Sequence, residues 1–390
     1  MWILNTLPEQ LPAIDSEISV PELEISRLQC NSLSESQSYT QIIDCNTQYI
    51  NQLLQYSSEH TNPVISEQIC IASINAAYGY EQLAQQIRES AYSDDSNPVD
   101  SQQWQSSTNY NKRAIGLLQF ASSVPMISIK LLTMCNQYAS LYRLNQQLSM
   151  VLLTISKMRT RLYPAGKDKY STLLSFQDSD LQSLSAVSMP YAKLAIGCSG
   201  VCDSIQHSIE SVHLKTQVLA MKRFLDCLSL ALLSIFKYDK ENDTDAALDM
   251  INTAIANIRP LLSKDQVNLL QNNKSLEKIL VKTKFWKESI KDKLKNKKWV
   301  HSKKSDKDSN SSYLHPFILE VIADFLLPLI MVLKVRYDTT NEFIFDNVGS
   351  NSSHNWVLPQ GKAPEVKGVR FFFDGSTLTV DQQAESENLR

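Results

Sequence analysis

Residues 213–262 read HLKTQVLAMKRFLDCLSLALLSIFKYDKENDTDAALDMINTAIANIRPLL, and this stretch indicates the fold of the whole chain. Apolar residues recur in its first half at alternating intervals of four and three, at Leu214, Val218, Met221, Leu225, Leu228, Leu232 and Ile235. That spacing places them on one face of a helix. Polar residues 239–245 then make a turn, and a second helix is expected over 246–262. A helix, a short turn and an antiparallel helix form the packing unit of a TPR-like solenoid.

The same periodicity recurs along the chain. It predicts further helices over 62–87, 111–121, 127–162 and 316–337. Pro63 suits the first helical position, whereas residues 94–108 have the Ser, Asp, Gln and Pro content of a loop. Residues 1–60 are polar and irregular, and we expect a small sheet and one helix there. The sequence therefore predicts a mainly α, elongated solenoid.

The composition argues against the common nucleotide-binding enzyme folds. Glycine occurs only nine times in 390 residues, about a third of the usual ~7%. Phosphate-binding loops and doubly wound sheets need the positive φ angles that glycine supplies. No nucleophile elbow, Walker loop or HExxH motif occurs. We therefore expect no enzyme activity and no cofactor.

The cysteines and the N-terminus indicate a cytoplasmic protein. Seven cysteines lie scattered in apolar stretches without the regular spacing of a disulfide framework. The first residues lack the basic flank and apolar run of a signal peptide. The apolar run from Phe325 to Leu333 is nine residues long, whereas a bilayer needs about 20, so we expect a buried helix there.

One set of residues suggests a metal site. Cys198, Cys202, His207 and His213 are zinc-ligand types within a short stretch. On a continuous helix His207 would point away from the two cysteines, and only a break at Ser199-Gly200 could bring all four together. The alternative is two core thiols and two partly exposed imidazoles, and we predict no metal.

Lysine dominates residues 278–307, where twelve lysines face three acidic residues, although the whole chain carries a net charge of −3. Two interpretations stay open: a solvated helix face followed by a loop, or a surface that contacts anionic lipid. The residues we expect at such a surface are Lys291, Lys293, Lys295, Lys297 and Lys298. Few aromatic residues accompany them, so nucleic acid is not an expected partner.

The predicted helix around residues 144–158 is apolar on more than one face, because residues 150–153 read MVLL. A helix that is apolar all round usually forms an interior layer. The alternative is that one face lines an open groove for a partner's amphipathic helix.

Three separated strings resemble landmarks of the Bro1 domain, the helical scaffold of ESCRT-associated proteins. They are NAAYGYEQLA at 75–84, QFAS at 119–122, and NEFIF at 341–345 followed by LPQGKA at 358–363. Phe345 stands where many members of the family carry a tyrosine. The resemblance implies one Bro1-like domain over residues 1–365, with the lysine-rich helix and loop 278–312 inside it, and a disordered tail over 366–390.

The resemblance also implies a function. Bro1 domains bind the C-terminal amphipathic helix of an ESCRT-III subunit in a hydrophobic groove, which aligns here with Leu148, Val151, Leu152 and Ile155. In its length the chain resembles the stand-alone fungal proteins of the PalC type. These are cytoplasmic adaptors in ambient-pH signalling and are recruited to plasma-membrane or endosomal sites. The signalling leads to proteolysis of a transcription factor. The competing hypothesis is a generic cytosolic helical-repeat scaffold without ESCRT-III binding.

Overall fold

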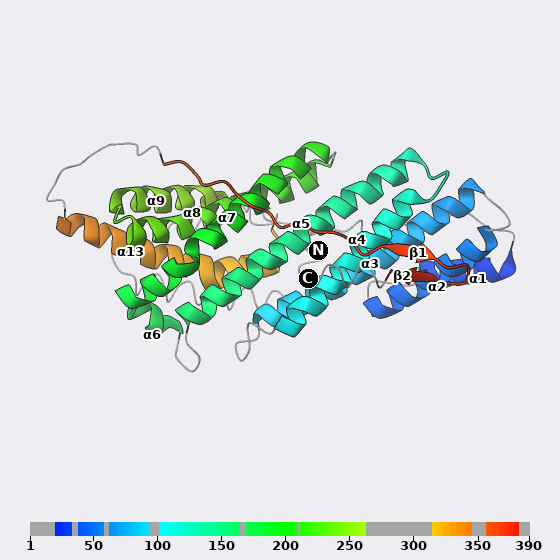
Figure 1. Ribbon diagram of the computed structural model, residues 1–390, viewed down its shortest axis with the longest axis horizontal. Coiled ribbons are helices and arrows are strands. Elements are labelled where there is room, and N and C mark those ends of the chain that lie inside the picture. The colour runs from blue at the N-terminus through cyan, green and yellow to red at the C-terminus, as the bar shows by residue number, and fades with distance from the viewer. Residues whose placement is uncertain are drawn as a thin grey trace, which may run out of the picture.

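The computed structural model describes residues 20–32, 38–57, 62–93, 101–163, 169–209, 211–262, 314–344 and 356–381. Over these residues the chain is an elongated assembly of helices with one small sheet (Figure 1). The first six helices are α1 (Pro21–Ser32), α2 (Tyr39–Ser57), α3 (Pro63–Ser93), α4 (Ser101–Ser123), α5 (Ile129–Leu162) and α6 (Lys169–Leu174). They are followed by α7 (Asp178–Ser208), α8 (Val212–Lys240), α9 (Thr244–Ile258) and the short 3-10 turn η1 (Arg259–Leu261). The mainly α prediction is confirmed.

The helices enclose two hydrophobic cores, and α5 belongs to both. One core is built from α1–α4 and includes Cys135 and Tyr142 of α5. The other is built from α7, α8, α9 and the C-terminal helices, and includes Leu144 and Leu162 of α5. With 34 residues, α5 is about 50 Å long at 1.5 Å per residue. It is the spine that joins the two halves of the molecule.

The predicted helix pair over 213–262 is present as α8 and α9. Asn242 in the turn adopts a φ of 53°, and the Asp243 side chain accepts a hydrogen bond from the Ala246 N–H at 3.0 Å. This N-cap satisfies one of the free amides at the start of α9. Pro63 begins α3 as predicted, after Asn62, whose side chain accepts from the Val64 N–H at 2.9 Å.

Two predictions in the first third of the chain differ from the structure. The described residues 21–32 and 39–57 form two helices where one was expected and contain no strand, and the rest of the predicted sheet region, including residues 1–19, lies outside the described part. Helix α4 begins at Ser101, ten residues before the predicted start near Asn111. Its polar first turns are held by packing on α3, since Trp104 is buried and the Ser107 hydroxyl donates to the Ala84 carbonyl at 2.9 Å. Tertiary contacts there override weak local propensity.

The most apolar helix crosses the second core. It consists of α12 (Pro316–Val321), a π-helical segment η3 (Ile322–Leu326) and α13 (Leu327–Ile344), which extends the predicted helix. Residues 316–341 are long and apolar enough to cross a membrane, yet their most apolar window is wholly buried inside the protein. That position is the one expected of a core helix.

The C-terminal residues differ from the predicted tail. Residues 356–381, here called the strap, run across one face of the body and end in the antiparallel strands β1 (Phe371–Phe373) and β2 (Leu378–Val380) (Figure 1). The sheet that the described residues form is therefore near the C-terminus. Within the strap Val366, Val369 and Leu378 are buried, so residues 366–381 are part of the folded body.

Polar contacts fix the strap to five helices in turn. They join Trp356 Nε1 to Asp249 Oδ2 of α9 (2.7 Å), Lys362 N to Lys193 O of α7 (3.0 Å), Gln147 Nε2 of α5 to Pro364 O (2.8 Å), Val369 N to Lys112 O of α4 (3.1 Å), and Leu378 N to Asn51 Oδ1 of α2 (2.7 Å). The strap thus bridges both cores, alongside α5.

Glycines allow the closest approaches of the strap. A Cβ on Gly361 would lie 2.5 Å from the Gly197 backbone nitrogen of α7. A Cβ on Gly368 would lie 2.7 Å from the backbone nitrogen of Gly116 on α4. Backbone meets backbone at both points, which only glycine permits.

Candidate functional site

The four residues of the predicted groove lie in the interior. Leu148, Val151, Leu152 and Ile155 are each 1% exposed and belong to the second core. The expectation of an open groove at these positions is therefore wrong, and the interior-helix alternative describes α5 here. The reason is that α5 packs between α3, α4 and α7, which cover its most apolar faces.

A narrower face of α5 remains accessible. Arg143, Met150, Leu153 and Thr154 are partly exposed, and Lys157 is exposed. We call these five residues the outer α5 stripe. Their spacing of seven, three, one and three residues keeps them on one side of a helix. The strap crosses α5 beside this stripe, where Gln147 donates to the Pro364 carbonyl.

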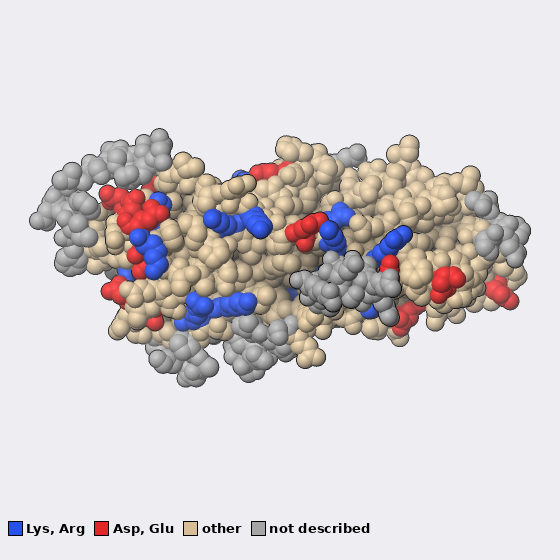
Figure 2. Space-filling model, viewed as in Figure 1, with Lys and Arg blue, Asp and Glu red and all other residues tan. Residues whose placement is uncertain are grey.

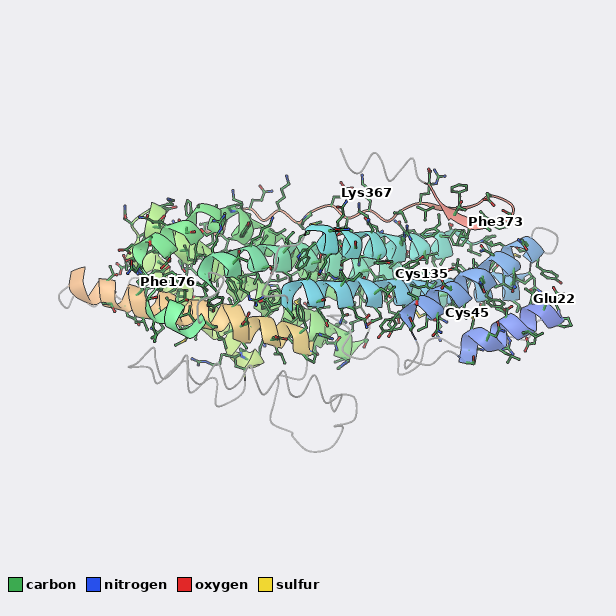
Figure 3. All side chains as sticks on the ribbon, turned by 90° about the horizontal axis from the view of Figure 1, so that it is seen from below. Glu22, Cys45, Cys135, Phe176, Lys367 and Phe373 are labelled. Carbon is green, nitrogen blue, oxygen red and sulfur yellow. The ribbon has the colours of Figure 1, made fainter. Side chains whose placement is uncertain are left out.

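The surface around the strap carries few charged side chains. Figure 2 shows Lys, Arg, Asp and Glu side chains scattered over this face, separated by broad uncharged areas. In Figure 3, Lys367 of the strap points away from the body. Lys367 also pairs with the exposed Glu365 at 3.3 Å.

The first resemblance string contributes a buried polar hub. Glu81 and Arg88 of α3 are both fully buried, and Arg88 Nη2 lies 2.7 Å from Glu81 Oε1. Asn111 of α4 donates to Glu81 Oε2, and Asn145 of α5 donates to Oε1 at 3.2 Å. One carboxylate thus ties three helices together. Because no part of it meets solvent, the hub fixes the packing and cannot reach a substrate.

A second buried ion pair fixes the other half of α5. Arg159 Nε lies 2.8 Å from Asp324 Oδ2 in the π-helical segment, and the Tyr163 hydroxyl donates to the Asp324 carbonyl at 3.1 Å. The guanidinium also lies over the Tyr92 ring, 4.9 Å from its centre. Burial raises the pKa of the Tyr92 hydroxyl well above its usual value. This tyrosine stays neutral and acts in packing.

The candidate zinc ligands do not converge. Helix α7 is continuous from Asp178 to Ser208, so Cys198 and Cys202 stand one turn apart inside the core. His207 and His213 are exposed. Burial raises the pKa of the Cys198 thiol to about 12, which disfavours the thiolate that zinc needs. In the part of the chain that the structure describes, no three His, Cys, Asp or Glu side chains form a group able to hold a metal ion.

The lysine prediction lies outside the described residues. The structure does not describe 263–313, which contains Lys291, Lys293, Lys295, Lys297 and Lys298. Contact of this segment with anionic lipid therefore stays a prediction.

The sequence did not indicate a small pocket beside the second resemblance string. A cavity of about 200 Å³ lies between the ends of α2, α3 and α4, lined by Leu54, Ile69, Phe120 and Val124 among others. It is smaller than typical ligand sites and could hold a single apolar side chain. Its lining comes from three helices, so no local pattern predicts it.

Comparisons with known proteins assign no activity. The model of a family described as "Family of unknown function (DUF5355)" matches residues 64–390. The uncharacterized protein YGR122W of Saccharomyces cerevisiae is 29% identical over 390 aligned residues, which cover 95% of this chain and 92% of the yeast protein. No solved structure matches this chain.

Proposed function

We propose that this chain, which belongs to the family of unknown function DUF5355, is a non-enzymatic adaptor of the Bro1 type. It binds the C-terminal amphipathic helix of an ESCRT-III subunit and links that subunit to fungal ambient (alkaline) pH signalling, which leads to proteolysis of a transcription factor. In this proposal the protein is cytoplasmic and is recruited to plasma-membrane or endosomal sites.

The observation that carries the proposal is where the three resemblance strings lie in the fold. The first supplies Glu81, the hub that joins α3, α4 and α5. The second places the buried Ala121 in the first core and Phe120 at the small pocket. The third supplies Gly361 and Lys362, which seat the strap on α7. Residues of all three strings make contacts that hold the elongated helical body together. This supports a fold shared with Bro1 domains rather than a chance match of residues.

The partner helix needs an accessible surface, and the buried groove residues cannot provide one. The outer α5 stripe is the nearest alternative on the same helix. Met150 and Leu153 offer half-buried apolar side chains, with Arg143 and Lys157 at the two ends. An amphipathic helix could place its apolar side chains against this pair and its acidic side chains near the cations.

The closed interior of α5 also favours the second candidate, a helical-repeat scaffold without ESCRT-III binding. The two candidates differ in whether an ESCRT-III helix binds at all. Both are non-enzymatic, in keeping with buried polar groups that serve packing.

Direct binding tests the proposal. We would titrate a labelled peptide of the ESCRT-III C-terminal helix into the purified chain and into two variants. Met150→Asp places a charge on the outer α5 stripe. Val212→Asp is the control, since it places the same charge away from the stripe, at the first residue of α8, which is 78% exposed. Full burial of Met is worth roughly 1.5–3 kcal/mol, so we expect Met150→Asp to weaken binding about tenfold or more.

We expect Val212→Asp to bind like the unaltered chain. Equal loss in both variants would contradict the location of the site. Absence of binding by the unaltered, folded chain would reject the adaptor and leave the scaffold.

A further inference from the structure

Two cysteines from neighbouring helices meet near the N-terminal end of the molecule. Cys30 of α1 and Cys45 of α2 bring their Sγ atoms to 3.2 Å. Cys30 is buried, with 6% of its surface exposed, whereas Cys45 is partly exposed. Figure 3 shows Cys45 towards the α1 end of the body. A disulfide requires about 2.05 Å between the sulfurs, so the two atoms need to approach by only about 1.2 Å.

We propose that Cys30 and Cys45 form a redox modification site, which a hydroperoxide converts to an intramolecular disulfide that links α1 to α2. The reaction needs no other protein group. The Cys45 thiolate attacks one oxygen of hydrogen peroxide, the O–O bond breaks, and with one proton the other oxygen leaves as water. The product is a sulfenic acid on Cys45.

The second step closes the disulfide. The Cys30 sulfur attacks the sulfenic sulfur of Cys45, the S–O bond breaks, and the hydroxyl leaves as water with the Cys30 proton. In total two thiols and one hydrogen peroxide give one disulfide and two waters. A small thiol reductant reverses the change by exchange.

The surroundings assign the two roles. Burial and the contact with Cys45 raise the pKa of the Cys30 thiol, so Cys30 keeps its proton and can donate it towards the Cys45 sulfur. Cys45 is also the more exposed of the two, so a peroxide reaches it first. Cys45 is therefore the attacking thiol and Cys30 the resolving thiol.

The chain contains its own control pair. Cys70 of α3 and Cys135 of α5 bring their Sγ atoms to 3.5 Å, and both residues are completely buried in the first core. The two pairs have similar separations but differ in access. Oxidation of the folded protein should therefore select the α1–α2 pair.

The disulfide between Cys30 and Cys45 would restrict the movement of α1 relative to α2. This helix packs chiefly on α2 among the described elements, so its docking depends on that contact. A disulfide between residues 30 and 45 removes most of the freedom of the undocked helix. We expect amide hydrogen exchange of α1 to slow about tenfold or more in the oxidised protein.

Peptide mapping tests the proposal. The full folded chain is treated with hydrogen peroxide, quenched, alkylated and digested without reductant. We expect a linked peptide pair containing Cys30 and Cys45, reversed by dithiothreitol, and no pair containing Cys70 and Cys135. In Cys30→Ser, the sulfenic acid of Cys45 should be trapped by a dimedone-type probe.

Three results would overturn the proposal. They are the absence of the 30–45 link under peroxide that oxidises a reference dithiol, equal linking of the buried pair, and trapping of the sulfenic acid on Cys30 in Cys45→Ser but not on Cys45 in Cys30→Ser.

Discussion

Replacing Gly197 by alanine tests whether the strap is an integral part of the fold. In α7, a Cβ at this position would lie 2.8 Å from Lys362 N and closer still to Lys362 C and Ala363 N. All three are backbone atoms, so the strap has to move as a unit to relieve the clash. Gly200, on the same helix, is the matched control, because a Cβ there meets nothing within 4 Å.

Two opposing effects set the magnitude. In a helix interior, alanine is about 1 kcal/mol more favourable than glycine, and Gly200→Ala should gain that amount. In Gly197→Ala the same gain is opposed by overpacking, about 1–3 kcal/mol. The hydrogen bond from Lys362 N to Lys193 O, worth about 1 kcal/mol, is also lost. We therefore expect Gly197→Ala to lower the free energy of unfolding by about 1–3 kcal/mol, whereas Gly200→Ala raises it.

Urea unfolding measures both free energies, and amide hydrogen exchange of residues 356–381 shows whether the strap has loosened. We expect faster exchange of the strap in Gly197→Ala and unchanged exchange in Gly200→Ala. Equal stability of the two variants, with equal protection of the strap, would refute the close seating of the strap on α7.

Three further predictions concern individual polar groups. Glu81→Gln should lower the free energy of unfolding by about 3–5 kcal/mol in urea titrations, because it removes the negative charge from the buried ion pair with Arg88; a wild-type midpoint would contradict the hub. Asp243→Ala removes the N-cap of α9 and should cost about 1 kcal/mol in the same assay, whereas no loss would mean that the cap is replaced by water. Hydrogen bonds from the Thr377 backbone N–H and from Ser376 lower the pKa of Asp374 from 3.8 to about 2. The stabilisation of the β1–β2 turn by the ionised Asp374 carboxylate is therefore present above pH 3.8 and is lost as the pH falls towards 2. As the pH falls through that interval, protection of the β1–β2 turn against hydrogen exchange, relative to the intrinsic exchange rate at each pH, should decrease; this decrease should be absent in Asp374→Asn, and an identical profile in the variant would contradict the assignment.

The helices that could be predicted from the sequence are those with one clean apolar stripe. The seven apolar stripe residues between Leu214 and Ile235 are all buried, so α8 and its return helix α9 follow from spacing alone. Helix α4 starts earlier than predicted because its first turns are polar and rely on α3 for packing. Periodicity reports a buried face but not the neighbour that buries it.

The candidate site shows the same limit more clearly. Residues 150–153 are all apolar, which leaves open which of them face the core. The structure places Val151 and Leu152 inside and leaves Met150 and Leu153 partly exposed, since α3, α4 and α7 cover the other faces of α5.

Neither the path of the strap nor the meeting of the thiol pairs follows from a local sequence pattern. The strap lacks periodicity, and its seat depends on Gly197 and Gly361, which are far apart in the sequence. Cys70 and Cys135 are likewise brought together only by the packing of α3 against α5. Contacts of this kind follow from the tertiary fold and not from any short stretch of residues.

Hydroxyl-radical footprinting of the methionines, with and without a saturating peptide of the ESCRT-III C-terminal helix, tests the adaptor proposal most directly. Met150 lies on the outer α5 stripe, and Met126, 60% exposed on the α4–α5 turn, is the internal reference. The account predicts that the bound peptide slows oxidation of Met150 and leaves that of Met126 unchanged. Unchanged oxidation of Met150 under saturating peptide, or no binding of the peptide at all, would contradict it.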